Sequence, residues 1–244
     1  MTPTTRSVDP LARWLEEEDV PDALGAELRA WLAGSPRFRA FADVYRDKIR
    51  KKLRTASDPE MRRDVRAELL VARLLLADRR FELAFEAYGS GHGGPDLTVS
   101  FRGARSFNLE ITRRRGAADP HGIGATLLAK LRQLPPSVPN ALLIALDGRT
   151  AQAVDVAAVA RGIRARADAK DEAFFTGRGF EGTRGFYERY LRLGAVFVWA
   201  ADAGPGGGAT LWINRSARIA MPDRAARAAL TCLSAAGVSA APAR

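Results

Sequence analysis

The segment PDLTVSFRGARSFNLEITRRR, residues 95–115, decides the fold class. Apolar and polar side chains alternate over residues 96–101 and again over 106–113, which is the period of half-buried β-strands. The intervening Arg102-Gly103-Ala104 indicates a turn between the two strands. Asp96 opens the first strand, and Glu110 lies on the polar face of the second. The segment therefore predicts two acidic groups on adjacent strands of one sheet.

Working outward, the flanking residues add a helix before the strands and a helix and strand after them. Asp58 is a helix cap, followed by Pro59 and Glu60 in the first turn of a helix that we expect to end near residue 78. A strand is expected over 80–87, a helix over 122–134 and a buried strand over 140–146. The predicted order from 58 to 146 is αβββαβ. Further helices are expected at 10–18, 21–33, 36–56, 154–167, 183–193 and 223–235, and further strands at 195–201 and 209–214.

These elements predict an α/β protein with three parts. Residues 1–57 form a helical N-terminal region that becomes basic toward its end. Residues 58–236 form an α/β domain with a mixed sheet and a C-terminal αβ extension, and residues 237–244 form a flexible tail. No internal repeat is found.

The composition favours a polyanionic partner. Among 244 residues, 38 are Lys or Arg and 28 are Asp or Glu, which gives a formal net charge of +10. Such a balance favours nucleic acid first and an anionic membrane surface second, although an Arg-rich coding bias would give the same number. Hydrophobic residues at 47% and charged residues at 27% are typical of a folded soluble chain.

Other sequence features indicate a cytoplasmic protein without a membrane partner. No apolar stretch approaches the roughly 20 residues of a membrane span, and the N-terminus lacks a signal-peptide pattern. The single cysteine, Cys232, excludes an internal disulfide and a zinc cluster built on paired cysteines.

The densest positive segment is 46–54, on the third expected helix. Arg46, Arg50 and Arg54 recur at four-residue steps and form a row on one helix face. This row either follows a phosphate backbone or is a solvated helix face.

Three carboxylates are candidates for chemistry. Glu68 has apolar neighbours on its helical wheel, so its burial requires a partner, which one of the many arginines would supply in a purely structural role. Asp96 and Glu110, on adjacent strands, repel each other unless a cation neutralises them. Hard oxygen ligands of this kind suit Mg²⁺ or Mn²⁺.

Pro95-Asp96, Glu110-Ile111-Thr112 and the αβββαβ order together resemble the PD-(D/E)xK superfamily of restriction-endonuclease-like nucleases. The resemblance covers residues 58–146 and implies a restriction-endonuclease-like core. It also implies a divalent metal, Mg²⁺ or Mn²⁺, held by Asp96 and Glu110, with Glu68 as an outer or bridging carboxylate. Enzymes of this superfamily often dimerise, and a homodimer is compatible with the sequence.

The sequence departs from this superfamily at Thr112, where the motif has a lysine two residues after the glutamate. The next helix offers Lys130 as a relocated catalytic lysine, with Gln133 as a supporting polar residue on the same stripe. The alternative is that Thr112 marks an inactive copy of the fold.

The sequence thus predicts a metal-dependent nuclease that hydrolyses DNA phosphodiester bonds, with DNA as its partner. Arg113, Arg114 and Arg115 follow the second strand of the hairpin and either contact phosphate or form a surface cluster. The alternative function is a catalytically inactive nuclease-fold module that binds nucleic acid or a protein partner.

Overall fold

The computed structural model describes residues 10–17, 22–87, 94–103, 105–116, 119–147, 151, 154–200 and 208–235. The chain divides into two compact units, Met1–Ala77 and Asp78–Arg244. The first unit is helical, and the second contains all six strands of the described residues. The tail expected at 237–244 lies outside the described residues.

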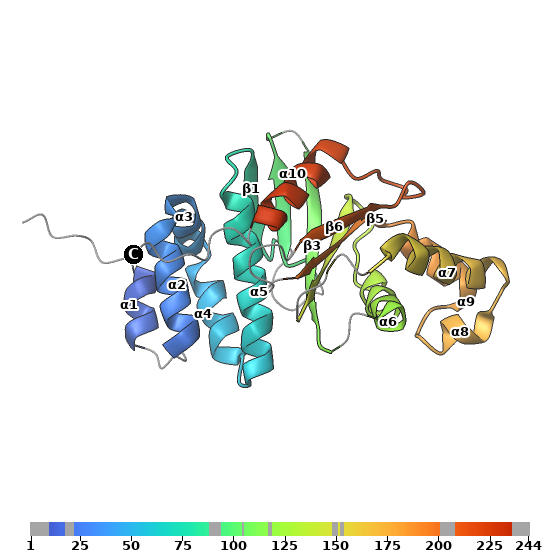
Figure 1. Cartoon of the computed structure of the whole chain (residues 1–244), viewed down its shortest axis with the longest axis horizontal. Helices are drawn as coiled ribbons and strands as arrows, with labels where there is room; N and C mark the ends of the chain where they lie inside the picture. Colours follow the sequence, from blue (N-terminus) through green and yellow to red (C-terminus); the bar gives the residue numbers. More distant parts are fainter. Residues whose placement is uncertain are drawn as a thin grey trace, which may run out of the picture. The chain divides into compact units, whose positions relative to one another are not determined.

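Two helices of the first unit begin at side chains that cap the backbone. Ser35 Oγ accepts a hydrogen bond from the Phe38 N–H at 3.3 Å, and Asp58 Oδ1 accepts from the N–H groups of Glu60 and Met61, both at 2.8 Å. The start predicted at Asp58 is therefore confirmed. The helices are α1 Pro10–Glu17, α2 Asp22–Gly34, α3 Pro36–Val44, α4 Arg46–Thr55 and α5 Pro59–Leu76 (Figure 1).

The helix expected over 36–56 is interrupted at Tyr45. This residue has φ −103° and ψ 19°, outside the helical region, so that α3 ends at Val44 and α4 begins at Arg46. The Tyr45 ring packs against Phe41 with centroids 5.0 Å apart. The sequence pattern missed the break because the apolar spacing continues through it: Phe38 and Phe41 are buried before the break, and Ile49 and Leu53 are buried after it.

The longest helix, α5, belongs to the first unit, whereas the sequence interpretation assigned it to the α/β domain. Glu27 of α2 and Arg66 of α5 form a two-point ion pair, with N–O distances of 2.6 and 2.8 Å. Arg37 Nη1 donates to the Leu76 carbonyl at 2.7 Å. These contacts bind α5 to the preceding helices, and they involve residues too distant in sequence to be recognised from periodicity.

A six-stranded mixed sheet organises the second unit, with the strands in chain order. The β1–β2, β2–β3 and β5–β6 pairs are antiparallel, and the β3–β4 and β4–β5 pairs are parallel. The predicted α/β class and the chain order αβββαβ are confirmed. The strands are β1 Phe81–Phe85, β2 Leu97–Phe101, β3 Arg105–Arg114, β4 Asn140–Leu146, β5 Leu193–Ala200 and β6 Ala209–Ile213.

Helices cover the two faces of the sheet differently. One face carries Leu142, Ile144 and Val196 and packs against a helical group that is coloured green to orange in Figure 1. The opposite face carries Phe101, which shares a pocket with residues of α10, Asp223–Ser234. The first group consists of α6 Pro120–Leu131, α7 Val156–Asp168, α8 Glu172–Thr176 and α9 Gly182–Tyr190.

The short helix α8 was not expected from the sequence. It has 5 residues, too few to show a helical period. Its fully buried Phe175 packs against Phe186 of α9 with ring centroids 4.6 Å apart. The helix is therefore stabilised by tertiary packing rather than by a local pattern.

A buried amide network joins β3 and β4 and supplies a stability prediction. Asn140 Nδ2 donates to the carbonyls of Pro135, Val138 and Arg192 at 2.8–3.0 Å, and its Oδ1 accepts from Asn108 Nδ2 at 3.1 Å. Replacing Asn140 by Ala removes the partner of the buried Asn108 amide and of three part-buried carbonyls, so we expect a loss of about 2–3 kcal/mol in urea unfolding. Ser106→Ala, a polar deletion at an exposed site of the same sheet, should cost less than about 0.5 kcal/mol. Equal costs for the two variants would contradict the role of the network.

Candidate active site

The structure brings Asp96 and Glu110 together on one face of the sheet. In the antiparallel β2–β3 ladder Leu97 lies opposite Leu109, and continuing this register by one residue places Asp96, just before β2, opposite Glu110. Opposite residues share a face, with Cβ atoms about 4.5–5.5 Å apart. The Ile111 N–H donates to Asp96 Oδ2 at 2.8 Å, which fixes the carboxylate against β3. Two acidic side chains thus lie side by side, as the strand pattern predicted.

Lys130 of α6 contacts Glu110, one of these two carboxylates. Its Nζ donates to Glu110 Oε1 at 2.7 Å and to Gln133 Oε1 at 3.2 Å. The Glu110 side chain is 9% exposed and that of Lys130 is 24% exposed. The expected contact of Lys130 with Glu110 is observed, while its approach to Asp96 and its role in catalysis stay predictions.

The capped start of α6 and its buried stripe together place Lys130 beside β3. Asp119 caps the helix by accepting from the Gly122 N–H at 2.8 Å, which lowers the pKa of that carboxyl group. Ile123, Leu127 and Leu131 bury one stripe of the helix against the sheet. Lys130 is on the neighbouring stripe, at the edge of the buried surface. Its long side chain can therefore cover apolar atoms while its ammonium reaches Glu110.

The contact between Lys130 and Glu110 offsets the cost of burying the Glu110 carboxylate. A carboxylate as buried as Glu110 loses most of its hydration, and the loss is costly unless a cation or hydrogen-bond donors replace the water. The Lys130 ammonium supplies both charge and donors at hydrogen-bond distance. Thr112 shares a face with Glu110 on β3, and its side chain carries no charge. The cation on this side of the sheet therefore comes from the helix instead of from the strand.

The three arginines after Glu110 have different environments. Arg113 forms a two-point ion pair with Asp147, at 3.0 and 2.9 Å, and its side chain is only 4% exposed. The guanidinium of Arg113 is buried against the end of β4, so it is not exposed for the phosphate contact that was considered from the sequence. Arg114 pairs with Asp119 at 3.3 Å, and Arg115 is exposed.

The sequence interpretation did not recognise Asp147 and Asp119 as partners of these arginines. A weak signal exists, since Asp147 directly follows β4, which lies parallel to β3 in the sheet. The Arg114 side chain also lies directly over Gly122: a Cβ there would be 1.6 Å from Arg114 Nη2 and would displace the guanidinium. The arginine therefore occupies the space that a larger residue at the helix start would fill.

The remaining candidates lie in the first unit. Glu68 of α5 forms an ion pair with Lys52 of α4, a lysine that the sequence interpretation did not consider as its partner. Its expected role beside the metal stays a prediction. In the basic row of α4, the guanidinium groups of Arg50 and Arg54 lie 5.3 and 5.7 Å from the Trp14 ring centroid. Arg46 has Asp43 and Asp47 within 3.8 Å.

Other chemistries find little support in the described part of the chain. Among the described residues, no group of three or more His, Cys, Asp or Glu side chains is arranged to hold a metal ion. Burial raises the pKa of the Cys232 thiol to about 11, so it is not a thiolate near neutral pH. His92 lies outside the described residues, and His121 is exposed in the first turn of α6. No described helix combines the length and apolarity needed to cross a bilayer.

Comparison with known proteins assigns no family. No family model matches the sequence, and no curated protein or solved structure shows significant similarity to it. The functional argument therefore depends on the site itself.

Proposed function

We propose that this protein is a metal-dependent nuclease that hydrolyses phosphodiester bonds of DNA, with a restriction-endonuclease-like core of the PD-(D/E)xK type. The observation that carries the proposal is the Lys130–Glu110 contact beside Asp96. Two carboxylates on adjacent strands with a lysine directed at one of them are the residue types that metal-assisted phosphodiester hydrolysis uses. The lysine comes from α6, which compensates for the Thr that stands at the usual motif position.

The donor set fits a magnesium ion. Magnesium is commonly held by one or two carboxylates, with substrate phosphate oxygens and water completing its octahedron. Asp96 and Glu110 supply that number and type of ligand. When bound there, Mg²⁺ or Mn²⁺ would lower the pKa of a coordinated water and stabilise charge on the phosphate.

Each neighbouring side chain has a role in this proposal. Asp96 is oriented by the Ile111 N–H, which fixes one of its oxygens and directs the carboxylate along β3. Lys130 would shift from Glu110 toward the scissile phosphate and balance its developing negative charge. Gln133, already within hydrogen-bond distance of Lys130, would hold the ammonium during this shift. Arg114, Arg115 and the row Arg46, Arg50 and Arg54 would contact the DNA backbone.

The direct test is cleavage of supercoiled, linear and branched DNA with Mg²⁺, with Mn²⁺ and with chelator, at low and moderate salt. Cleavage that requires the metal and is absent from a Glu110→Gln preparation purified in the same way supports the proposal. Intact substrates under every condition would overturn it.

Thr112 favours a second candidate function, an inactive nuclease-fold module that binds nucleic acid or a protein partner. Such a module needs its basic contacts but no metal. Its DNA affinity should fall steeply with salt and should be the same with Mg²⁺ as with chelator. Metal-dependent cleavage excludes this candidate.

The different environments of Arg113 and Arg115 predict different effects of substitution. Arg113→Ala leaves the half-buried Asp147 without its bidentate partner, so we expect a loss of about 1–2 kcal/mol of stability and little change in DNA binding at a temperature where the variant is folded. Arg115→Ala should keep the melting temperature and reduce the slope of log K against log salt by about 0.9, as for one lost phosphate contact. Fluorescence anisotropy at several salt concentrations, together with thermal melts, measures both. A reversed pattern would remove Arg115 from the proposed interface.

A further inference from the structure

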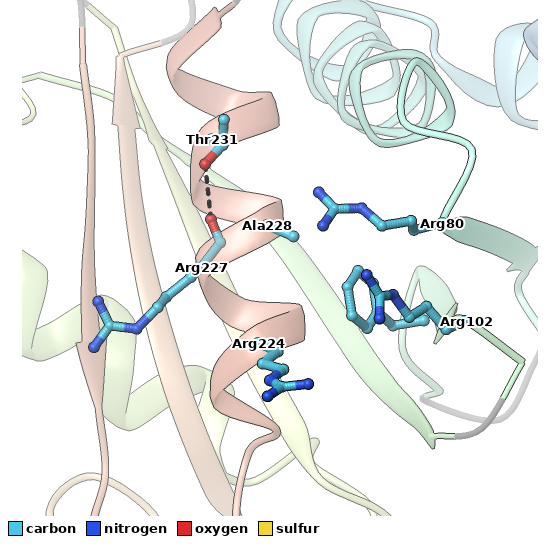
Figure 2. A pocket seen from close by; sticks show the side chains of 7 residues that line it. Arg80, Arg102, Arg224, Arg227, Ala228 and Thr231 are labelled. Carbon is cyan, nitrogen blue, oxygen red and sulfur yellow. Dashed lines mark hydrogen bonds between the residues drawn. The ribbon is translucent and has the colours of Figure 1, made fainter.

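A second basic site lies on the face of the sheet opposite to Glu110. A pocket of about 370 Å³ lies between α10 and the turns that carry Arg80, before β1, and Arg102, after β2 (Figure 2). Phe101, which faces it, belongs to the face of Leu97 and Val99, whereas Glu110 belongs to the other face. The pocket is therefore separate from the candidate active site. Four of its lining residues are arginines: Arg80, Arg102, Arg224 and Arg227.

The hairpin side of the pocket is fixed in place. The Arg102 N–H donates to the Arg80 carbonyl at 2.7 Å, which joins the two arginines through the backbone. Their guanidinium groups lie 5.3 and 5.7 Å from the Phe101 ring centroid, so both are held by cation–π contacts. Phe101 is only 8% exposed, and its ring is therefore not an open platform for stacking a base.

The helix side is more exposed. One face of α10 lines the pocket, since residues three or four apart on a helix share a face. Its members are Arg224, Arg227, Ala228 and Thr231. In Figure 2 the Arg224 side chain extends toward the hairpin side of the pocket, while the Arg227 guanidinium points away from it. Thr231 Oγ1 donates to the Arg227 carbonyl at 3.0 Å. The positive groups that face one another across the pocket are therefore Arg224 on α10 and, on the other side, Arg80 and Arg102.

Little negative charge compensates this cluster within the part of the chain that is described. Arg80 pairs with Asp78, with Nη2 at 2.6 Å from Oδ2. Among the described residues, no carboxylate pairs with Arg102, Arg224 or Arg227, and Asp223, beside Arg224 in sequence, pairs with Arg215 at 3.3 Å. Like charges that face each other across a pocket repel, and a bound anion offsets that repulsion.

We infer that this pocket binds a phosphate group. Guanidinium groups present planar pairs of N–H donors that match the oxygens of phosphate, and three of them line this pocket from the turn before β1, the turn after β2 and α10. The volume lies in the range of small-ligand sites, whereas the lining offers no open apolar surface for a nucleobase. The phosphate belongs either to the end of a nucleic-acid strand or to a free phosphorylated small molecule. Because the pocket and Glu110 lie on opposite faces, the inference does not depend on nuclease activity.

The test is pyrophosphate binding by calorimetry at low salt with chelator present, so that no cleavage occurs. Arg224 is exposed and forms no ion pair with the residues that the structure describes, and we expect Arg224→Ala to weaken binding about tenfold, as for one lost charge-assisted hydrogen bond. Thr231→Glu, which adds a carboxylate among the arginines, should weaken it at least as much. The matched control is Arg161→Ala, which changes an exposed arginine of α7. This helix packs on the sheet face that carries Glu110, so the substitution should change pyrophosphate affinity less than about twofold.

A second measurement distinguishes the source of the phosphate. Oligonucleotides with a 5′-phosphate and with a 5′-hydroxyl are compared on the unmodified protein and on Arg224→Ala. A preference for the 5′-phosphate that Arg224→Ala removes assigns the site to nucleic-acid ends. Equal binding of the two oligonucleotides, with pyrophosphate binding retained, assigns it to free phosphorylated ligands. Absence of pyrophosphate binding, or equal losses in Arg224→Ala and Arg161→Ala while both variants keep the melting temperature, would overturn the inference.

Discussion

Replacing Glu110 by Gln is expected to abolish metal-dependent DNA cleavage, with a loss of at least about a thousandfold in rate. Metal ions contribute several kcal/mol of charge stabilisation to phosphoryl chemistry, and each 1.36 kcal/mol corresponds to a factor of ten. Glutamine keeps the size of the side chain and can still accept from Lys130, so that the local packing is preserved. It removes the negative charge on which the proposed metal site depends. Initial cleavage rates at saturating Mn²⁺, with Mn²⁺ affinity from calorimetry, measure the effect.

The matched control is Glu82→Gln, the same chemical change at an exposed position of β1 in the same sheet. It should leave both the rate and the Mn²⁺ affinity within about twofold of the unmodified protein, because exposed charges at a distance are screened. If Glu110→Gln cleaves as fast as Glu82→Gln, Glu110 is not a metal ligand and the proposed site is wrong. If neither variant nor the unmodified protein cleaves, the inactive-module candidate is favoured.

The sequence was sufficient to predict the elements that form the candidate site. Alternation over 96–101 and 106–113 identifies the hairpin, and a two-residue period assigns Glu110 to the polar face. A 3.6-residue period places Lys130 beside the buried stripe of α6. Both inferences hold because they use local geometry that the tertiary structure does not alter. The contact between Lys130 and Glu110 then follows from the packing of α6 on β3, which is the usual result when a helix follows a strand in a parallel crossover.

The sequence could not predict which of the many arginines pair with a carboxylate and which remain exposed. Arg113 looks equivalent to Arg115 in sequence, yet it is buried because Asp147, 34 residues away, is at the end of the neighbouring parallel strand. The arginine pocket has the same origin, since Arg102 and Arg224 approach each other only through the fold. The interruption at Tyr45 and the assignment of α5 to the first unit depend likewise on contacts between distant residues.

Lys130→Ala is expected to separate the two candidate functions. In a nuclease the variant should cleave about a hundredfold more slowly, as when one preorganised donor to the transition state is lost, while DNA affinity stays nearly unchanged. It should also cost about 1–3 kcal/mol of stability without metal, because the buried Glu110 carboxylate loses its cation. Since Lys130 and a metal ion neutralise the same carboxylate, Mn²⁺ should bind the variant more tightly and restore part of the lost stability. Calorimetry and thermal melts with and without Mn²⁺ test this independently of cleavage.

Two further substitutions show whether the position or merely the charge of Lys130 matters. Lys130→Arg should recover stability and little of the cleavage rate, because a planar guanidinium does not place its charge where a compact ammonium does. Thr112→Lys in the Lys130→Ala background should recover part of the rate, since residue 112 shares the face of Glu110 on β3. A fall in stability alone, with the cleavage rate of Lys130→Ala equal to that of the unmodified protein, would reduce the Lys130–Glu110 contact to a structural ion pair. In that case the ammonium would have no part in the chemistry, and catalysis would have to depend on the two carboxylates and the bound metal without it.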